Sequence, residues 1–305
     1  MILAVSLNPC LDRIVYVQEL KTGTLNRGQK ILVSAGGKGV NVAKVVAALE
    51  EPVCLTGFFA GAAGRYIISD LDGRGVRTKP VWLENQETRT TVNIMDLKTG
   101  KETEITEPGP LIPPQKIDEF FETAKKAVEE ASVVVLSGSL PKGVDPDIYK
   151  TLILFAKDLG KYTVLDASGQ PLEKGIEAGP TAIKPNVREM GALMGNEKPG
   201  KEQIAEYCGR LREKGISYVC VSMGSEGAFL SFEDQIHFMK AFSVNAVNTI
   251  GCGDAMTAGL AVGLQRGYKP FDMLRFATAC AASNATFEEI GVVDKETVEK
   301  LYLRP

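Results

Sequence analysis

Histidine and closely spaced cysteines are scarce in this sequence, which excludes several kinds of site. One histidine, His237, occurs in 305 residues, and the six cysteines are far apart with no CxxC pair. Zinc sites and disulfide frameworks need such residues in clusters, so we expect neither, and the cysteines fit a reducing compartment. His237 lies in an apolar strand-like run, where we expect it to pack against neighbours rather than act as a base.

Long apolar runs and an excess of one charge are also missing. No stretch reaches the about 18 consecutive apolar residues that a membrane helix needs, and Met1 leads into the apolar residues 2–7 without a basic segment. The net charge of −3 offers no basic surface to nucleic acid or to an anionic membrane. We therefore expect a soluble, cytoplasmic protein whose partners include neither nucleic acid nor membrane.

Short apolar runs alternate with helical patterns along most of the chain. Runs rich in β-branched residues occur at 2–7, 53–58, 133–137, 162–166, 181–184 and 218–223. Helical patterns occur at 41–49, 116–131, 145–159, 201–214, 254–267, 270–288 and 294–301, and residues 228–240 resemble a hairpin. The alternation predicts an α/β fold, with a doubly wound, mostly parallel sheet and helices on both faces.

Half-polar strand patterns interrupt this order at about 11–33 and 88–106, where Thr91 and Asn93 alternate with Val92 and Ile94. Such alternation fits a small separate sheet better than a sheet buried on both faces. We interpret it as a lid. No repeat or linker divides the chain, so we expect a single domain over residues 1–305.

A glycine loop before the helical run at 254–267 carries the clearest chemical signal. Gly251, Cys252 and Gly253 precede Asp254, and glycines at a helix start let backbone amides bind an anion. A carboxylate there would repel a phosphate, but it suits a base that deprotonates a hydroxyl while the amides stabilise a phosphoryl group in transfer. Asp254 as a plain helix cap remains open. Cys252, between two glycines, is also a candidate reactive thiol.

A second glycine loop lies at residues 35–43. It is no dinucleotide fingerprint, because Val42 stands where the third glycine belongs, and no P-loop, because Gly39 rather than serine or threonine follows Lys38. A sugar-hydroxyl site involving Asn41 and a plain structural turn both fit it.

Asn186 and Glu189 are three residues apart at a helix start and share one face. They suit either hydrated Mg²⁺ on a nucleotide or a capping box. Further glycine-bearing turns follow strands at 137–143 and 222–227. The carboxyl ends of parallel strands meet at one edge of the sheet, so we expect these loops to gather around one ligand site.

The order of these motifs resembles the phosphofructokinase-B, or ribokinase-like, carbohydrate kinase family across nearly the whole chain. Its two hallmark stretches are similar to AGGKGVNVA at 35–43 and NTIGCGDAMTAG at 248–259. The branch that contains 1-phosphofructokinase and tagatose-6-phosphate kinase is similar to LNPCLD at 7–12, ETRTTVNI at 87–94, SGSLPKG at 137–143, LDASG at 165–169 and IKPN at 183–186. The resemblance implies a ribokinase-like core with a β-sheet lid, ATP with Mg²⁺, and a homodimer formed through the lid.

The resemblance also implies a role for each matching residue. Asp254 would be the catalytic base, and Gly251, Cys252 and Gly253 the anion hole. The sugar phosphate would be held by Asp12, Gly37, Lys38, Asn41, Arg89 and Ser139. The nucleotide side would be lined by Lys184, Asn186, Ser222, Gly224 and Gly227, with Glu189 organising the metal through water. Cys252 replaces the family's usual alanine, which we expect to leave the amides in place, and Arg27 is a further candidate phosphate ligand.

The expected function is therefore an ATP-dependent sugar-phosphate kinase that converts fructose 1-phosphate to fructose 1,6-bisphosphate, with tagatose-6-phosphate kinase as the alternative. Two other classes are disfavoured. The failed fingerprint argues against a nicotinamide dehydrogenase. The retained Asp254 beside intact glycines argues against a non-catalytic sugar-phosphate sensor.

Overall fold

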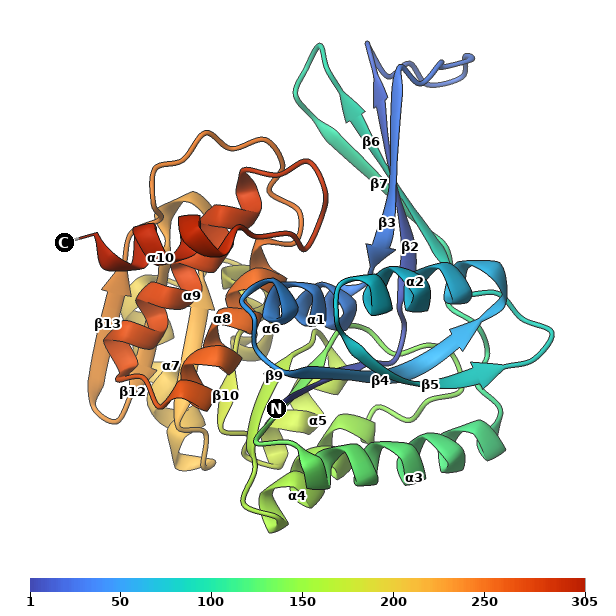
Figure 1. The fold of residues 1–305 in the computed structure, drawn as a ribbon. Helices are drawn as coiled ribbons and strands as arrows, with labels where there is room; N and C mark the ends of the chain where they lie inside the picture. The colour runs from blue at the N-terminus through green and yellow to red at the C-terminus, as the bar shows by residue number, and fades with distance from the viewer. Residues whose placement is uncertain (305) are drawn as a thin grey trace.

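The computed structural model describes residues 1–304, and within them the strands form a large and a small sheet (Figure 1). The main sheet has the order β13-β12-β11-β10-β9-β8-β1-β4-β5. Its strands are β1 (Ile2–Ser6), β4 (Val53–Ala60), β5 (Arg77–Leu83), β8 (Val133–Ser137), β9 (Tyr162–Asp166), β10 (Ala182–Ile183), β11 (Tyr218–Ser222), β12 (Ala228–Phe232) and β13 (Gln235–Met239). Neighbours pair in parallel except at β12, which runs against β11 and β13.

Helices cover both faces of the main sheet because its strands are apolar on both sides. In β1, Ile2 and Ala4 join one buried cluster, whereas Leu3 and Val5 join the other. The first cluster is covered by α1 (Lys38–Ala48), α2 (Gly61–Gly73), α8 (Cys252–Arg266), α9 (Pro270–Ala285) and α10 (Lys295–Leu303). The second is covered by α3 (Pro114–Glu130), α4 (Ile148–Asp158), α5 (Gln170–Glu177), α6 (Val187–Met194) and α7 (Lys201–Glu213). The predicted α/β fold with a mostly parallel sheet is confirmed.

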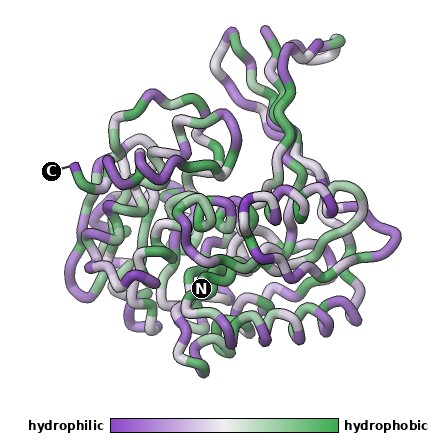
Figure 2. Tube along the Cα trace, in the orientation of Figure 1, coloured by the Kyte–Doolittle hydropathy of each residue, from purple (hydrophilic) through white to green (hydrophobic). Residues whose placement is uncertain are grey.

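The small sheet has the order β3-β2-β6-β7 and stands away from the rest of the molecule in Figure 1. Its strands are β2 (Cys10–Val17), β3 (Lys30–Gly36), β6 (Thr90–Asp96) and β7 (Glu102–Thr106), close to the ranges expected from the alternating pattern. The polarity is inverted relative to an ordinary surface sheet. Thr91 and Asn93 are buried, whereas Val92 and Ile94 are half-exposed on the opposite face. Figure 2 shows apolar stretches running up this projecting sheet.

Several elements were not expected from the sequence, notably α2, β5 and α5. Gly61 and Gly64 in its first turn weaken the helical signal of α2, but Ile67 and Leu71 pack it onto the sheet. Pro80 obscures β5, which tolerates a proline because it is an edge strand. The hairpin at 228–240 is confirmed, with Glu233 in the left-handed region at its turn. Tertiary packing therefore decided the elements that the local pattern missed.

No helix within residues 1–304 has both the length and the apolar character needed to cross a membrane.

Candidate active site

Asp254 lies in the first turn of α8, directly after the glycine loop. Gly251 precedes the helix in the left-handed region at a φ of 81°, which favours glycine. The loop is braced by Asn284, whose Nδ2 donates to the carbonyl oxygen of Ile250 at 2.9 Å. The first-turn amides and the positive end of the helix dipole are thereby fixed around Asp254.

The Asp254 carboxylate meets the second glycine loop. Its side chain is 7% exposed, and Oδ2 accepts a hydrogen bond from Asn41 Nδ2 at 2.8 Å. Burial raises the pKa of Asp254 above its usual range, while the positive charge of Lys38 and the bond from Asn41 oppose that rise. The two hallmark loops, more than 200 residues apart in the chain, thus converge on one carboxylate of unusual basicity.

Asp166, at the end of β9, organises the cations beside Asp254. Its carboxylate is buried and contacts Lys38 Nζ at 2.9 Å and Lys184 Nζ at 3.4 Å. It also accepts a hydrogen bond from the hydroxyl of Thr257 on α8 at 2.7 Å. Burial alone would raise the pKa of Asp166, but the charges of Lys184 and Lys38 lower it, so the group is ionised.

The position of Lys184 follows from the same cluster. A Cβ placed on Gly253 would lie 3.6 Å from Lys184 Nζ, so the ammonium group sits beside the glycine loop. Asp166 raises the pKa of Lys38, so that group also carries its charge. Two ammonium groups, helix amides and a basic carboxylate can hold an anion and take a proton from an adjacent alcohol.

The predicted sugar side is built by β2, the residues before β6, and the loop before α1. Asp12 on β2 is 5% exposed and accepts a hydrogen bond from Cys10 Sγ at 3.1 Å; burial raises the pKa of Asp12 to about 6. A Cβ on Gly36 would overlap the Asp12 carboxylate, which explains the glycine there. Gly37 follows it and precedes α1. The backbone therefore approaches this carboxylate closely.

Arg89 lies at the base of the small sheet. Its guanidinium donates to the carbonyl oxygen of Asn8 at 3.1 and 3.2 Å and to the hydroxyl of Thr106 at 2.6 Å. Asn8 Nδ2 in turn donates to Ser139 Oγ at 3.2 Å. The structure thus joins Arg89 to Ser139 through Asn8, a residue that we did not select from the sequence.

On the predicted nucleotide side, Asn186 and Glu189 form a reciprocal capping box at the start of α6, with both hydrogen bonds at 2.9 Å. The capping box, which the sequence offered as the alternative to a magnesium site, is therefore present. The pair also faces the site, because Glu189 Oε1 lies 4.0 Å from Lys38 Nζ. A bridge pairs Asn186 with Ser222 at the end of β11.

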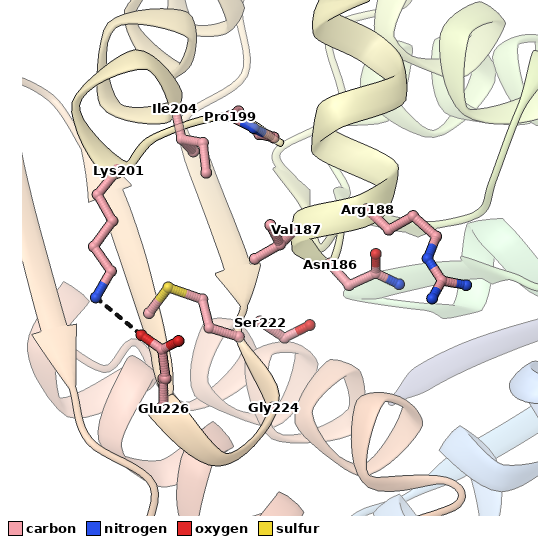
Figure 3. A pocket seen from close by; sticks show the side chains of 10 residues that line it. Asn186, Val187, Arg188, Pro199, Lys201, Ile204, Ser222, Gly224 and Glu226 are labelled. Carbon is pink, nitrogen blue, oxygen red and sulfur yellow. Dashed lines mark hydrogen bonds and ion pairs between the residues drawn. The ribbon is translucent and has the colours of Figure 1, made fainter. Parts of the chain in front are cut away.

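A pocket of about 640 Å³ borders these residues, and Figure 3 shows the side chains around it. Asn186, Ser222 and Gly224 line it together with residues of α7, but over residues 1–304 its lining leaves out Asp254 and Lys184. The pocket is thus beside the proposed reaction centre rather than at it. Gly227 has a packing reason to be glycine, since a Cβ there would overlap the carbonyl oxygen of Met239.

The surroundings of Cys252 and His237 argue against a chemical role for either side chain. Burial raises the pKa of the Cys252 thiol, which makes it less rather than more reactive. His237 on β13 packs against the ring of Phe271 with centroids 5.9 Å apart, as expected of a packing residue.

Sequence similarity extends over almost the entire chain. A model of the pfkB family of carbohydrate kinases matches residues 4–291. The chain belongs to the pfkB carbohydrate kinase family. A tagatose-6-phosphate kinase of Staphylococcus epidermidis is 34% identical over 307 residues, covering 99% of this chain and 97% of that protein.

Solved structures of pfkB-like kinases share the fold. A possible 1-phosphofructokinase from Thermotoga maritima has a TM-score of 0.90 at 27% identity and covers 99% of this chain and 97% of its own. Ribokinase from Arabidopsis thaliana, complexed with ribose and ATP, has a TM-score of 0.80 at 24% identity and covers 100% and 99%. The fold is ribokinase-like, and this pfkB kinase is a phosphotransferase that acts on a sugar phosphate.

Proposed function

We propose that this kinase transfers the γ-phosphoryl group of ATP to the 6-hydroxyl of fructose 1-phosphate. The hydrogen bond between Asn41 and Asp254 carries the proposal, because it joins the predicted sugar loop to the predicted catalytic loop at a carboxylate of raised pKa. ATP as donor is supported by the ribokinase neighbour that holds it.

Each wall of the site would have a distinct task. Asp254 would accept the proton of the acceptor hydroxyl, and the amides of residues 251–253 would stabilise charge on the phosphoryl group. Asp12, Gly37 and Asn41 would orient the sugar, and Arg89 with Ser139 would hold its phosphate. Lys38, whose ammonium group lies beside Asp166 and Asp254, would contact the substrate at its reacting end. Lys184, Asn186, Ser222, Gly224 and Gly227 would line the nucleotide side.

Magnesium would arrive with the nucleotide rather than in a protein cage. Within residues 1–304, no three histidine, cysteine, aspartate or glutamate side chains group closely enough to hold a metal. Glu189 has one carboxylate oxygen in the capping box and the other towards Lys38, which fits Mg²⁺ bound through retained waters. The ion, when bound, would neutralise charge between the phosphates of ATP.

The small sheet would serve as a lid of a single-domain enzyme spanning residues 1–305. Asp12 lies on β2 and Arg89 directly before β6, so both move with this sheet if it tilts. Closing it over a bound sugar phosphate would exclude water from the transfer step.

Fructose 1-phosphate and tagatose 6-phosphate are hard to distinguish for a chemical reason. The two exocyclic CH₂O groups of a ketohexofuranose flank the ring oxygen almost symmetrically, so a phosphate clamp at one end and Asp254 at the other can hold either. The products differ only at C4, and selectivity rests on one hydroxyl. The Staphylococcus epidermidis relative supports tagatose 6-phosphate as the second candidate.

Steady-state kcat/KM for fructose 1-phosphate, tagatose 6-phosphate, fructose 6-phosphate, fructose and ribose tests the proposal. We expect fructose 1-phosphate to be best, tagatose 6-phosphate second, and fructose several decades poorer, because it leaves the clamp unpaired. A preference for tagatose 6-phosphate selects the second candidate. A preference for an uncharged sugar would refute the clamp.

We further propose a homodimer formed through the lid. Ile31 on β3 and Ile105 on β7 are 52% and 56% exposed, and Val15, Val92 and Ile94 lie between them on the same face by strand register. This face is mostly apolar, although it also carries Arg13 beside Val92, and it lies opposite the face that buries Thr91 and Asn93. A second copy would cover it with an identical face, which a twofold axis permits.

The dimer is tested by Ile31→Glu, which places a charge on the apolar face that the second copy would cover. Light scattering should give the mass of a dimer for the wild type and of a monomer for the variant. Leu303→Glu, at an apolar side chain 75% exposed on α10, is the matched control and should stay dimeric. A monomeric wild type, or an unchanged Ile31→Glu mass, would contradict the proposal.

A further inference from the structure

Lys44 on α1 is buried inside the molecule rather than pointing to solvent. It is 2% exposed, and lysine is almost never so buried without partners. Its Nζ donates to the carbonyl oxygen of Ala35 at 3.1 Å, to Glu289 Oε1 at 3.0 Å and to the carbonyl oxygen of Ile290 at 2.6 Å. Burial lowers the pKa of Lys44, and the charge of Glu289 counters that effect.

The partners of Lys44 lie next to two loops of the site, the sugar loop at residues 35–43 and the catalytic loop at residues 248–254. Ala35 directly precedes Gly36 and Gly37 on the sugar side. Ile290 packs on the catalytic loop, since a Cβ on Gly251 would lie 2.8 Å from Ile290 Cγ2. Lys44 is also one helical turn beyond Asn41, which bonds Asp254. One ammonium group therefore touches the supports of the two loops that must meet around the acceptor hydroxyl.

Residues 288–291, which follow α9, pass this contact on to the catalytic loop. The amide of Gly291 donates to Asn284 Oδ1 at 3.0 Å, and Asn284 Nδ2 donates to the Ile250 carbonyl oxygen at 2.9 Å. Asn248 Nδ2 donates to the Glu288 carbonyl oxygen at 2.9 Å. Glu288 and Gly291 lie on either side of the two residues that contact Lys44. Glu288 is hydrogen-bonded to Asn248 of the catalytic loop, and Gly291 is hydrogen-bonded to Asn284, which braces that loop.

Ion pairs anchor the same segment elsewhere. Glu289 Oε1 also contacts Arg74 Nη2 at 2.6 Å, and Glu288 pairs with Lys30 of the small sheet at 2.5 Å. Glu288 and Lys30 are both about half exposed, so that pair contributes little. The buried ammonium of Lys44, bonded to backbone on both walls, is the stronger link.

We propose that Lys44 is a positioning residue that fixes the catalytic loop relative to the sugar loop. It touches no reacting atom. Without it, Ile290 would no longer be held against Gly251, and the amides of residues 251–253 would no longer point at the phosphoryl group in transfer. A displacement of about 1 Å at such a loop can lower the rate about 100-fold. The inference rests on the proposed role of those amides.

Four variants test it. Lys44→Met fills the space without donors, Lys44→Arg keeps charge and donors, and Glu289→Gln weakens one partner. Lys295→Met, which removes a surface lysine paired with Glu50 at 2.6 Å, is the matched control. We expect Lys44→Met to lower kcat about 10- to 100-fold with each KM changed less than about threefold. Lys44→Arg should retain far more activity than Lys44→Met, Glu289→Gln should lose several-fold, and Lys295→Met should match the wild type.

Amide hydrogen exchange over residues 248–256 reads the link without any substrate. Faster exchange there in Lys44→Met, but not in Lys295→Met, supports the proposal. If Lys44→Met does not fold, Glu289→Gln decides by the same two measurements. A normal kcat per folded molecule together with unchanged exchange would overturn it. Failure of the proposed function looks different: the wild type would not phosphorylate the sugar phosphates, or Asp254→Asn would keep its kcat.

Discussion

Asp254→Asn should leave the fold intact and lower kcat by about 10²- to 10⁴-fold, the usual contribution of a positioned base. Asparagine has the same shape and can still accept the hydrogen bond from Asn41 Nδ2, so the packing around the loop should persist. Steady-state kinetics of the wild type and of Asp254→Asn, with nucleotide affinity measured separately, check this. Asp158→Asn, at the exposed end of α4, is the control.

The pH profile separates a base from a helix cap at this position. A base must be ionised, and burial raises the pKa of Asp254. As the pH decreases, kcat/KM of the wild type should therefore begin to fall well above the usual aspartate pKa of about 4. The part of that acidic limb that belongs to Asp254 should vanish in Asp254→Asn, whereas any part that belongs to Asp12, whose pKa burial raises to about 6, should remain. Near-normal turnover with only a higher KM would instead leave Asp254 as a structural cap.

Arg89→Ala should raise KM for the sugar phosphate about 10- to 100-fold and KM for ATP far less. A hydrogen bond to a charged group contributes about 1.5–3 kcal/mol, and the forked guanidinium matches a phosphate. The Arg89 guanidinium donates to the Asn8 carbonyl oxygen and to the Thr106 hydroxyl. The substrate phosphate would therefore have to replace some of these hydrogen bonds.

Two arginine variants make that result specific. Arg89→Lys keeps the charge without the fork and should fall between wild type and Arg89→Ala. Arg77→Ala removes an exposed arginine of the edge strand β5, where Arg77 pairs with Glu130 of α3. It should change neither KM. Equal increases in both KM values for Arg89→Ala would reject the clamp and indicate a general disturbance of the site.

The sequence was informative where chemistry is local and silent where it depends on packing. Glycine loops at helix starts pointed to Asp254 and Asn41, which the fold brings into hydrogen-bond contact, and strand runs with helical spacing predicted the main sheet. Asp166 was not selected, although a carboxylate at the end of a buried strand was a usable signal. Its role depends on Lys38, Lys184 and Thr257, which only the fold brings together.

Lys44 shows the limit more sharply. A lysine within an apolar helix is ordinarily expected to reach solvent, and nothing near it in the chain indicates otherwise. Its acidic partner Glu289 is 245 residues away. Similarly, the spacing of Asn186 and Glu189 could not separate a capping box from a metal-organising pair, because a separation of three residues fits both; the structure shows the capping box.

The strand register at the centre of the main sheet restricts how this chain can change in length. Ser137 pairs with Asp166, and Ile183 pairs with Leu165, so Lys184 follows opposite Asp166. Because side chains alternate between faces, one residue inserted into β8, β9 or β10 would turn its terminal side chain to the other side of the sheet. β10 itself is only Ala182–Ile183, too short to absorb a shift. Insertions and deletions among homologous chains should therefore be found at the amino-terminal ends of these strands and in the loops that precede them.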